Sequence, residues 1–213
     1  MATIDQTLHP SDVPAPQEAA PAGAVAWGNS APLALAGFAV TTFMLSMVNA
    51  GLINVGVEPV VFAVALMFGG LAQLIAGVLQ FRIGNTFGGV LFSTFGAFWL
   101  SLFAIAQFYL KGIPAAQTGN ALGLFLLAFG IFTVWIGVAS FRTNAVVVVA
   151  LADLAATFFL LASGNFSGSA DTIKAGGYLG LVAAFLAAYL SCAELCEASY
   201  HRSVLPVWPL AKH

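Results

Sequence analysis

Six apolar segments of membrane-spanning length follow one another along the chain, and almost no charged side chain falls inside them. A helix needs about 20 mostly apolar residues to cross the hydrocarbon core of a bilayer. Only 7% of the 213 residues are charged, whereas an average soluble domain carries about 25%. We therefore predict an all-α integral membrane protein built as a bundle of six transmembrane helices. The expected spans are Ala31–Ile53, Pro59–Phe81, Thr86–Leu110, Gly119–Phe141, Asn144–Ser163 and Lys174–Glu197.

The two ends of the chain differ from this apolar region. Residues 1-28 contain prolines and acidic residues but no Lys or Arg, so they lack the basic start of a signal peptide. We predict a disordered N-terminal tail over 1-28, a transmembrane domain over 29-198 and a cytoplasmic C-terminal tail over 199-213. The net charge of -2 does not suit nucleic-acid binding, which depends on basic residues.

The positive charges between the spans predict the orientation of the protein in the bilayer. The side that holds both termini carries Arg82, Arg142, Arg202 and Lys212. The opposite side carries Lys111 and Lys174. Because loops rich in Lys and Arg tend to face the cytoplasm, we expect cytoplasmic termini and a location in the cell membrane.

The spans can be grouped as three helical hairpins that repeat along the chain. The odd-numbered spans start near three asparagines, 56 and 59 residues apart, which are Asn29, Asn85 and Asn144. About ten residues further in lie large apolar residues 57 and 59 apart, which are Phe38, Phe95 and Leu154. This spacing predicts three apolar side chains at one depth, at the kind of repeat interface that transporters use as a pathway. Coincidence is the alternative, since the chain has 19 Phe residues.

Small residues recur at helical spacing and predict close packing between helices. The last span carries one row every four residues, formed by Gly176, Gly180, Ala184 and Ala188. Gly84 and Gly88 start a second row at the third span. Such rows let helix backbones approach one another in membranes.

Two acidic residues are candidates for a proton-linked role. Asp153 lies inside the fifth span, where a charge costs about 3 kcal/mol on insertion scales, so we expect it to face the bundle interior or water. It either exchanges a proton during the functional cycle or stays neutral and bonds a neighbouring hydroxyl or carbonyl. Glu194 lies near the end of the last span. It either lines a cytoplasmic vestibule or bonds the ends of helices.

The sequence offers little support for other classes of membrane protein. Cys192 and Cys196 have no second Cys or His cluster at metal-ligand spacing, so we expect neither a metal nor a cofactor. An intramembrane protease would need a second Asp to pair with Asp153, or a Ser–His pair or a zinc-binding set inside the spans. The His residues instead lie near the ends of the chain. A water channel would use two Asn-Pro-Ala motifs, whereas this sequence has one altered copy, NSAP. A membrane scaffold or sensor without transport activity remains the alternative to a transporter.

Several motifs, in the correct order, resemble the acetate uptake transporter family, which includes bacterial succinate–acetate permeases. The family signature Asn-Pro-Ala-Pro-Leu-Gly-Leu reads NSAPLAL here, with Ser30 in place of Pro and Ala34 in place of Gly. The other matching segments are GFAVTTFMLSMVNAG, GGLAQLIAG, GNTFGGVLFSTFGAFWL, SGNFSG and RSVLP. Because Pro favours a helix start, we expect Ser30 to loosen the entry to the first helix. Ala34 is expected to narrow a close backbone contact.

The resemblance implies a function and a site. Members of the family form hexamers of six-helix protomers, and each protomer has its own pathway for acetate and, in some members, succinate or other short carboxylates. Some members are proton-coupled and others are channel-like. The family's apolar constriction corresponds to Phe38, Phe95 and Leu154, where Phe95 replaces a common Tyr. The resemblance therefore implies acetate and other small carboxylates as partners, within a homo-hexamer in a lipid bilayer.

Neutral polar side chains are the candidates for contact with a carboxylate along such a pathway. No Lys or Arg falls inside a span, which suits weak binding at several sites and rapid passage. Capping of helix ends or bonding between helices is the alternative role for each of these residues. The candidates are Asn29, Thr41, Thr42, Asn49, Gln73, Asn85 and Thr86.

Overall fold

The computed structural model of the chain describes residues 27–210. Most of the N-terminal tail expected over 1-28 lies outside the described residues, as does Lys212. Within the described part, six helices are long and apolar enough to cross a membrane, with mean hydropathies from 1.8 to 2.5. They run over Ala31–Asn49, Val55–Arg82, Thr86–Gly112, Ala115–Ser140, Ala145–Ser167 and Ala170–Tyr200. The six spans predicted from the sequence are therefore confirmed.

Three of the spans are single α-helices and three are composite. The single helices are α1 (Ala31–Asn49), α6 (Ala145–Ser167) and α7 (Ala170–Tyr200). The second span consists of η2 (Val55–Val57), α2 (Glu58–Val64), η3 (Ala65–Ala72) and α3 (Gln73–Arg82). The third and fourth spans consist of α4 (Thr86–Ala104), η4 (Ile105–Tyr109) and η5 (Leu110–Gly112), then η6 (Ala115–Gln117) and α5 (Thr118–Ser140).

The connection between the last two spans is much shorter than predicted. We expected a loop from Gly164 to Ile173, but α6 continues to Ser167 and α7 begins at Ala170. Gly168 has a φ of 67° and ends α6, a conformation that glycine adopts without steric cost. The hydroxyl of Ser169 accepts a hydrogen bond from the Thr172 amide at 3.3 Å and caps α7. The SGNFSG motif is therefore a helix end and a tight turn.

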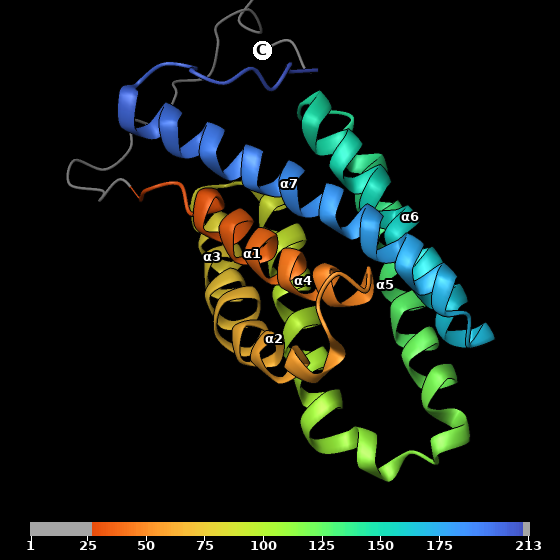
Figure 1. Cartoon of the computed structure of the whole chain (residues 1–213). Coiled ribbons are helices and arrows are strands. Elements are labelled where there is room, and N and C mark those ends of the chain that lie inside the picture. The colour runs from red at the N-terminus through yellow and green to blue at the C-terminus, as the bar shows by residue number, and fades with distance from the viewer. Residues whose placement is uncertain (1–26, 211–213) are drawn as a thin grey trace, which may run out of the picture.

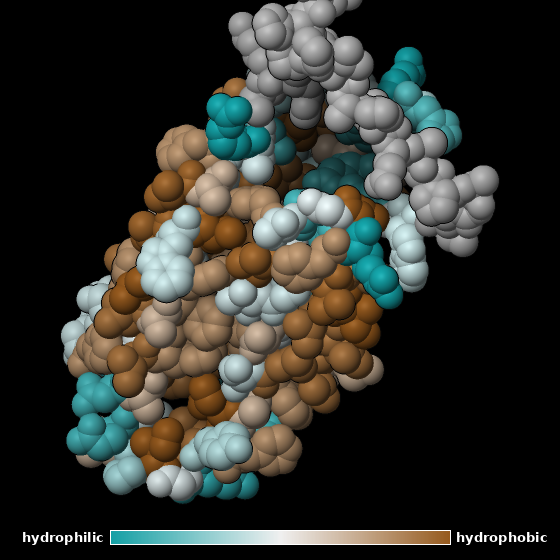
Figure 2. Space-filling view, turned by 180° about the vertical axis from the view of Figure 1, so that it is seen from behind, coloured by the Kyte–Doolittle hydropathy of each residue, from teal (hydrophilic) through white to brown (hydrophobic). Residues whose placement is uncertain are grey.

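The helices pack in two groups that α7 joins (Figure 1). The first group contains α1, the composite second span and α4, and the second contains α5 and α6. Helix α7 lies along both α1 and α6. Figure 2 shows a broad band of apolar side chains on one face, with hydrophilic residues toward the two ends. Exposed residues such as Trp135, Val138 and Phe185 fit a surface that faces lipid rather than water.

Small residues bring the helices into close contact, although not all of the predicted rows do so. A side chain at Gly176 would collide with Leu161 of α6, and one at Gly180 would collide with Ser46 of α1. The end of this row is different, because Ala188 is exposed. The second predicted row is wrong at Gly84, which has a φ of 77° and forms the turn before α4.

Helix η3 packs its backbone directly against α1 and α4. A Cβ atom at Gly69 would lie 2.6 Å from Thr41 Oγ1 and 2.9 Å from Trp99 Cγ. A Cβ atom at Gly37 would lie 2.6 Å from the Phe68 carbonyl oxygen. These contacts leave no room for larger residues, so they fix the depth at which Thr41 and the Trp99 ring lie in the bundle.

Candidate functional site

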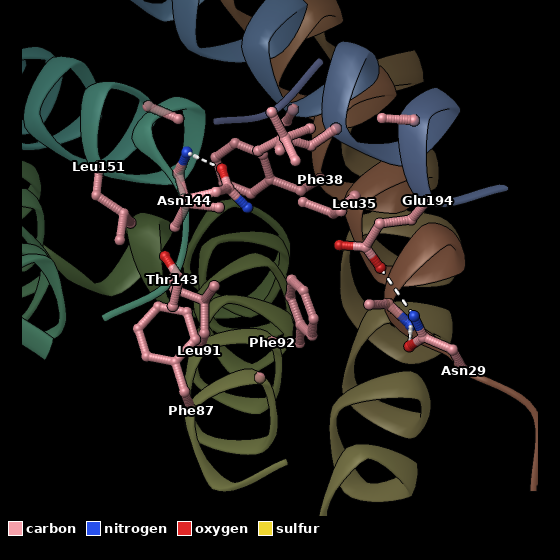
Figure 3. A pocket seen from close by; sticks show the side chains of 18 of the residues that line it. Asn29, Leu35, Phe38, Phe87, Leu91, Phe92, Thr143, Asn144, Leu151 and Glu194 are labelled. Carbon is pink, nitrogen blue, oxygen red and sulfur yellow. Dashed lines mark hydrogen bonds between the residues drawn. The ribbon is translucent and has the colours of Figure 1, made fainter. Parts of the chain in front are cut away.

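A cavity of about 800 Å³ opens at the end of the bundle where α1, α4 and α6 begin. This volume lies within the range of about 300–1,000 Å³ that is usual for ligand sites. Figure 3 shows Asn29 and Glu194 on one side of the cavity, with Asn144 and Leu151 on the other. The walls come from α1, α3, α4, α6 and α7, so all three predicted hairpins contribute to it.

The three asparagines of the predicted repeat all line this cavity. Asn85 caps α4, because its side-chain oxygen accepts a hydrogen bond from the Gly88 amide at 2.9 Å. Asn144 caps α6 in the same way through the Val147 amide, at 3.0 Å. Asn29 accepts from the Ala31 amide at 3.0 Å. Asn85 and Asn144 therefore combine helix capping with a place in the cavity wall, and Asn29 bonds the first residue of α1.

A chain of side-chain hydrogen bonds connects one side of the cavity mouth. The amide nitrogen of Asn29 donates to Glu194 Oε2 at 2.9 Å (Figure 3). The buried side-chain amide of Gln80 is hydrogen-bonded to Asn29 at 2.9 Å and to Asn85 at 2.6 Å. These bonds join the starts of α1 and α4 to the ends of α3 and α7, so Glu194 both lines the cavity and bonds helix ends.

Ser30, one of the two departures from the family signature, bonds to α3. Its hydroxyl donates to the carbonyl oxygen of Ala76 at 2.8 Å, and it also lies 2.8 Å from the Gln80 amide. Pro32 still occupies the first turn of the helix. The hydroxyl therefore ties α1 to α3, and the looser entry stays a prediction. Ala34 is completely buried.

The inner end of the cavity is closed by apolar side chains. Phe38, Phe95 and Leu154 all line it, and all three are buried. The rings of Phe38 and Phe95 meet edge to face with centroids 5.5 Å apart. Phe95 also stacks on Phe158 at 6.2 Å. Residues of α1, α4 and α6 at equivalent positions of the predicted repeat therefore meet at one place.

A second, small cavity of about 40 Å³ lies next to these apolar side chains. Phe38 and Leu154 are the two residues that line both cavities, so their side chains form the wall between them. The small cavity continues along α1 through Thr42, Ser46 and Asn49. The polar face of α1 therefore extends from Phe38 toward the opposite end of the bundle.

The cavities contain most, but not all, of the predicted site residues. Asn29, Gln73, Asn85 and Glu194 line the large cavity, while Thr42 and Asn49 line the small one. The remaining three candidates, which are Thr41, Thr86 and Asp153, line neither. The hydroxyl of Thr41 donates to the Gly37 carbonyl oxygen at 2.8 Å. One carboxylate oxygen of Asp153 is buried and has no hydrogen-bond partner among the described residues.

The charge of the large cavity is low and negative. Among residues 27–210, the charged side chains on its walls are Glu194 and Glu197, and no Lys or Arg belongs to the wall. Every other polar group that lines it is an amide or a hydroxyl. A carboxylate would therefore meet these two acids, neutral hydrogen-bond donors and the partial positive ends of α4 and α6, but no fixed cation.

The chain after α7 folds back across the cavity mouth as a C-terminal strap, residues 203–210. In Figure 1 it runs from the end of α7 back to the beginning of α6. The carbonyl oxygen of Trp208 accepts from the Ala145 amide, and the Leu210 amide donates to the Thr143 carbonyl oxygen, both at 2.9 Å. Leu205 and Val207 of the strap line the large cavity.

Sequence reasoning missed several residues of this site. Asn144 had a signal, because its spacing matched that of Asn29 and Asn85, but it was not selected as a pathway residue. Leu205 and Val207 lie outside the apolar spans, so hydropathy gave no reason to choose them. Trp99, on the wall of the small cavity, looks like one more apolar core residue in the sequence.

Comparisons with known proteins indicate the family of the chain. The sequence model of the GPR1/FUN34/yaaH family matches residues 12–212. Over 210 residues the chain is 39% identical to the ammonia transport outward protein 2 of Saccharomyces cerevisiae, covering 96% of this chain and 71% of that protein. It is 35% identical over 179 residues to the succinate-acetate/proton symporter SatP of Escherichia coli, covering 84% of this chain and 94% of the symporter.

A solved structure shares the fold. The structure of the bacterial acetate channel SatP superposes on this chain with a TM-score of 0.80 and 35% sequence identity. The match covers 85% of this chain and 99% of the channel. The fold and the family that the sequence motifs indicated are therefore confirmed.

Proposed function

The chain belongs to the GPR1/FUN34/yaaH family, and on that basis we propose that it transports acetate and related short carboxylates, including succinate, across the membrane. Two relatives support this cargo by their names, a succinate-acetate/proton symporter and an acetate channel. The pathway lies within each protomer. It runs from the large cavity, past Phe38, Phe95 and Leu154, into the small cavity along α1.

The observation that carries the proposal is the pair of cavities that Phe38 and Leu154 separate. An open vestibule that ends at a ring of apolar side chains, with polar groups again beyond it, is the arrangement of a gated pathway. An apolar constriction resists hydrated ions and can gate by dewetting. Acetate presents a slim methyl group to such a ring and exposes its charge only to the polar walls.

The polar residues of the walls suit passage rather than capture. Asn29, Asn85 and Gln73 line the vestibule, and Thr42 and Asn49 line the small cavity. Neutral donors hold an anion less tightly than Lys or Arg does, since they lack the Coulomb attraction of a full opposite charge. Phe95 presents no hydroxyl to the cargo at the constriction.

A proton-linked step would involve one of two acids. Glu194 is the first candidate, because it lines the vestibule and its carboxylate accepts from Asn29. Asp153 is the second candidate, because it neighbours Leu154 on α6 and keeps one buried oxygen without a partner among residues 27–210. In proton symport a proton crosses with each acetate, and one of these side chains would carry it. Channel-like passage of the acetate anion would need neither side chain for that purpose.

The assembly and orientation form part of the same proposal. The vestibule opens on the side of Arg82, Arg142 and Arg202, so we place it at the cytoplasm, with both chain termini, in the cell membrane. Exposed apolar faces, for example at Trp135 and Phe185, are available for lipid and for neighbouring protomers of a homo-hexamer.

Flux measurements on the purified protein test this function. Reconstituted into liposomes, the protein is expected to take up labelled acetate faster than empty vesicles, with competition by unlabelled acetate and succinate. Uptake no faster than in empty vesicles would leave the alternative of a scaffold or sensor. An ammonium gradient without acetate serves as a second arm, because one relative is named for outward ammonia transport.

A further inference from the structure

The small cavity beyond the constriction is lined by polar groups as well as aromatic rings. One face of α1 contributes three polar residues to the small cavity, which are Thr42, Ser46 and Asn49. The polar wall of this cavity is completed by Trp99 of α4 and Thr157 of α6. Because Phe38 and Leu154 form the shared boundary with the vestibule, a molecule that passes the constriction reaches these groups first.

Two hydrogen-bonding groups in this wall have no partner among the described residues. They are the indole nitrogen Nε1 of Trp99 and the hydroxyl of Thr42. Trp99 is 2% exposed and Thr42 is 6% exposed, so bulk water does not satisfy them. Most buried polar groups in folded proteins have partners, and leaving one unpaired destabilises the fold by about 1–3 kcal/mol. The two groups are therefore available to bond a molecule that enters the small cavity.

The other buried threonines show what Thr42 would do if it were only structural. Thr41, Thr133 and Thr157 each donate their hydroxyl to the backbone carbonyl four residues earlier, at 2.8, 2.7 and 3.0 Å. This is the usual way for a helix to satisfy a threonine in an apolar environment. Thr42 is the exception among the buried threonines of residues 27–210, and its hydroxyl stays free for another acceptor.

The Trp99 ring is held firmly while its N–H group stays free. The ring packs edge to face against Phe98 at 5.0 Å and against Phe38 at 6.5 Å, and Gly69 leaves room for it. A phenylalanine could make the same apolar contacts. The indole nitrogen adds a group that only donates hydrogen bonds, so its partner must be an acceptor.

We propose that the Trp99 indole N–H and the Thr42 hydroxyl form a carboxylate-binding site directly beyond the Phe38–Leu154 constriction. This inference rests on the proposed function and adds the step that follows the constriction. The cavity volume of about 40 Å³ is close to that of one water molecule. The carboxylate therefore enters together with a rotation of Phe38, whose ring contacts Trp99 and separates the cavities. Two neutral donors replace hydration on the far side of the apolar ring without trapping the anion.

Substitutions that remove the hydrogen-bonding group test the two donors. Trp99→Phe removes the N–H group and keeps an aromatic ring, while Thr42→Val removes the hydroxyl and keeps the shape. Each is expected to raise the half-saturating acetate concentration of uptake by about tenfold, which corresponds to about 1.4 kcal/mol. Thr41→Val and Trp135→Phe are the matched controls, because Thr41 already bonds Gly37 and Trp135 is exposed on α5. The controls are expected to behave like the wild-type protein.

A binding measurement on the wild-type protein makes the test independent of transport and of variant folding. The chain has 4 Trp residues, and fluorotryptophan labels all of them for fluorine NMR. The resonance lost in Trp99→Phe identifies Trp99. If that variant does not fold, single replacement of the other three, Trp27, Trp135 and Trp208, identifies it by elimination. Titration with acetate is expected to shift the Trp99 resonance, whereas chloride at equal ionic strength leaves it in place.

The outcomes separate this inference from the proposed function. The donor site is overturned if the wild-type protein takes up acetate, its Trp99 resonance does not shift, and both variants keep the wild-type half-saturating concentration. That result leaves the proposed transport function intact. A Trp99 shift that chloride reproduces also overturns it, because the site would then respond to ionic strength rather than to a carboxylate. Absence of acetate uptake by the wild-type protein contradicts the proposed function itself.

Discussion

Removal of the Phe38 ring is the sharpest test of the constriction. Phe38 lines both cavities and is buried at their boundary. Phe38→Ala would join the two spaces into one continuous passage. We expect faster acetate uptake and weaker discrimination against larger carboxylates, because the apolar wall that the cargo must displace is gone.

The contacts of the ring give the size of the effect. Phe38 meets Phe95 at 5.5 Å and Trp99 at 6.5 Å, both edge to face. Each such pair contributes about 0.5–1.5 kcal/mol beyond burial, so displacing the ring costs about 1–3 kcal/mol. If this displacement limits passage, its removal accelerates uptake by about 5- to 150-fold. The substitution also destabilises the fold by about 3–5 kcal/mol, the usual cost of Phe→Ala in a core.

Acetate uptake into proteoliposomes measures the rate, and competition by lactate and succinate measures discrimination. Phe43→Ala is the matched control on the same helix, because Phe43 is 40% exposed and packs against Phe185 rather than lining a cavity. Size-exclusion profiles and thermal unfolding show whether both variants are folded. A folded Phe38→Ala protein with the uptake rate and competition profile of Phe43→Ala would refute the constriction.

Three further substitutions test the two acids and the cap of α6. Glu194→Gln keeps an acceptor for Asn29, so we expect a folded protein whose acetate uptake no longer changes between acidic and neutral pH; an unaltered pH profile argues against a proton role for Glu194. Asp153→Asn is expected to change the same pH profile less, since Asp153 lines neither cavity; loss of pH dependence in this variant alone would place the proton step there. Asn144→Ala removes the cap of α6 and is expected to lower the free energy of unfolding by about 1 kcal/mol; thermal unfolding measures this, and an unchanged midpoint would show that the cap contributes nothing.

The sequence predicted the spans well because the bilayer sets their length. Apolar segments of about 20 residues leave few other folds open, and all six appear within a few residues of their predicted bounds. The largest error was the loop before α7. Gly164, Asn165 and Ser167 resemble loop residues by composition, but Gly164 packs on Ile173, and the Asn165 and Ser167 side chains bond carbonyl groups of α6. Tertiary contacts and local bonds therefore extended the helix past the residues that usually end one.

The part of the candidate site that lies at equivalent positions of the threefold repeat could be predicted from the sequence. Phe38, Phe95 and Leu154 were selected by equal spacing and by family resemblance, and the structure brings them together at the end of one cavity. The same spacing placed Asn29 and Asn85 at the vestibule. Helical repeats carry this information because equivalent residues of packed hairpins lie at similar depth.

Features that depend on the direction of a side chain could not be predicted. Thr41 and Thr42 are neighbours with the same chemistry, yet one donates to Gly37 and the other faces the small cavity. The difference follows from the 100° rotation between successive helix residues and from the position of η3. The places of Trp99 and Val207 likewise depend on how α4 and the strap pack.

Cysteine accessibility at the constriction tests the central claim of a pathway through each protomer most directly. Cys192 and Cys196 are first replaced by Ala, and Leu154→Cys then places the only thiol of the chain between the two cavities. We predict that a small thiol reagent abolishes acetate uptake by this variant and that acetate slows the labelling. The control is Val149→Cys on the exposed side of α6, where labelling leaves uptake intact. Full uptake after complete labelling of the cysteine at position 154 would contradict the pathway.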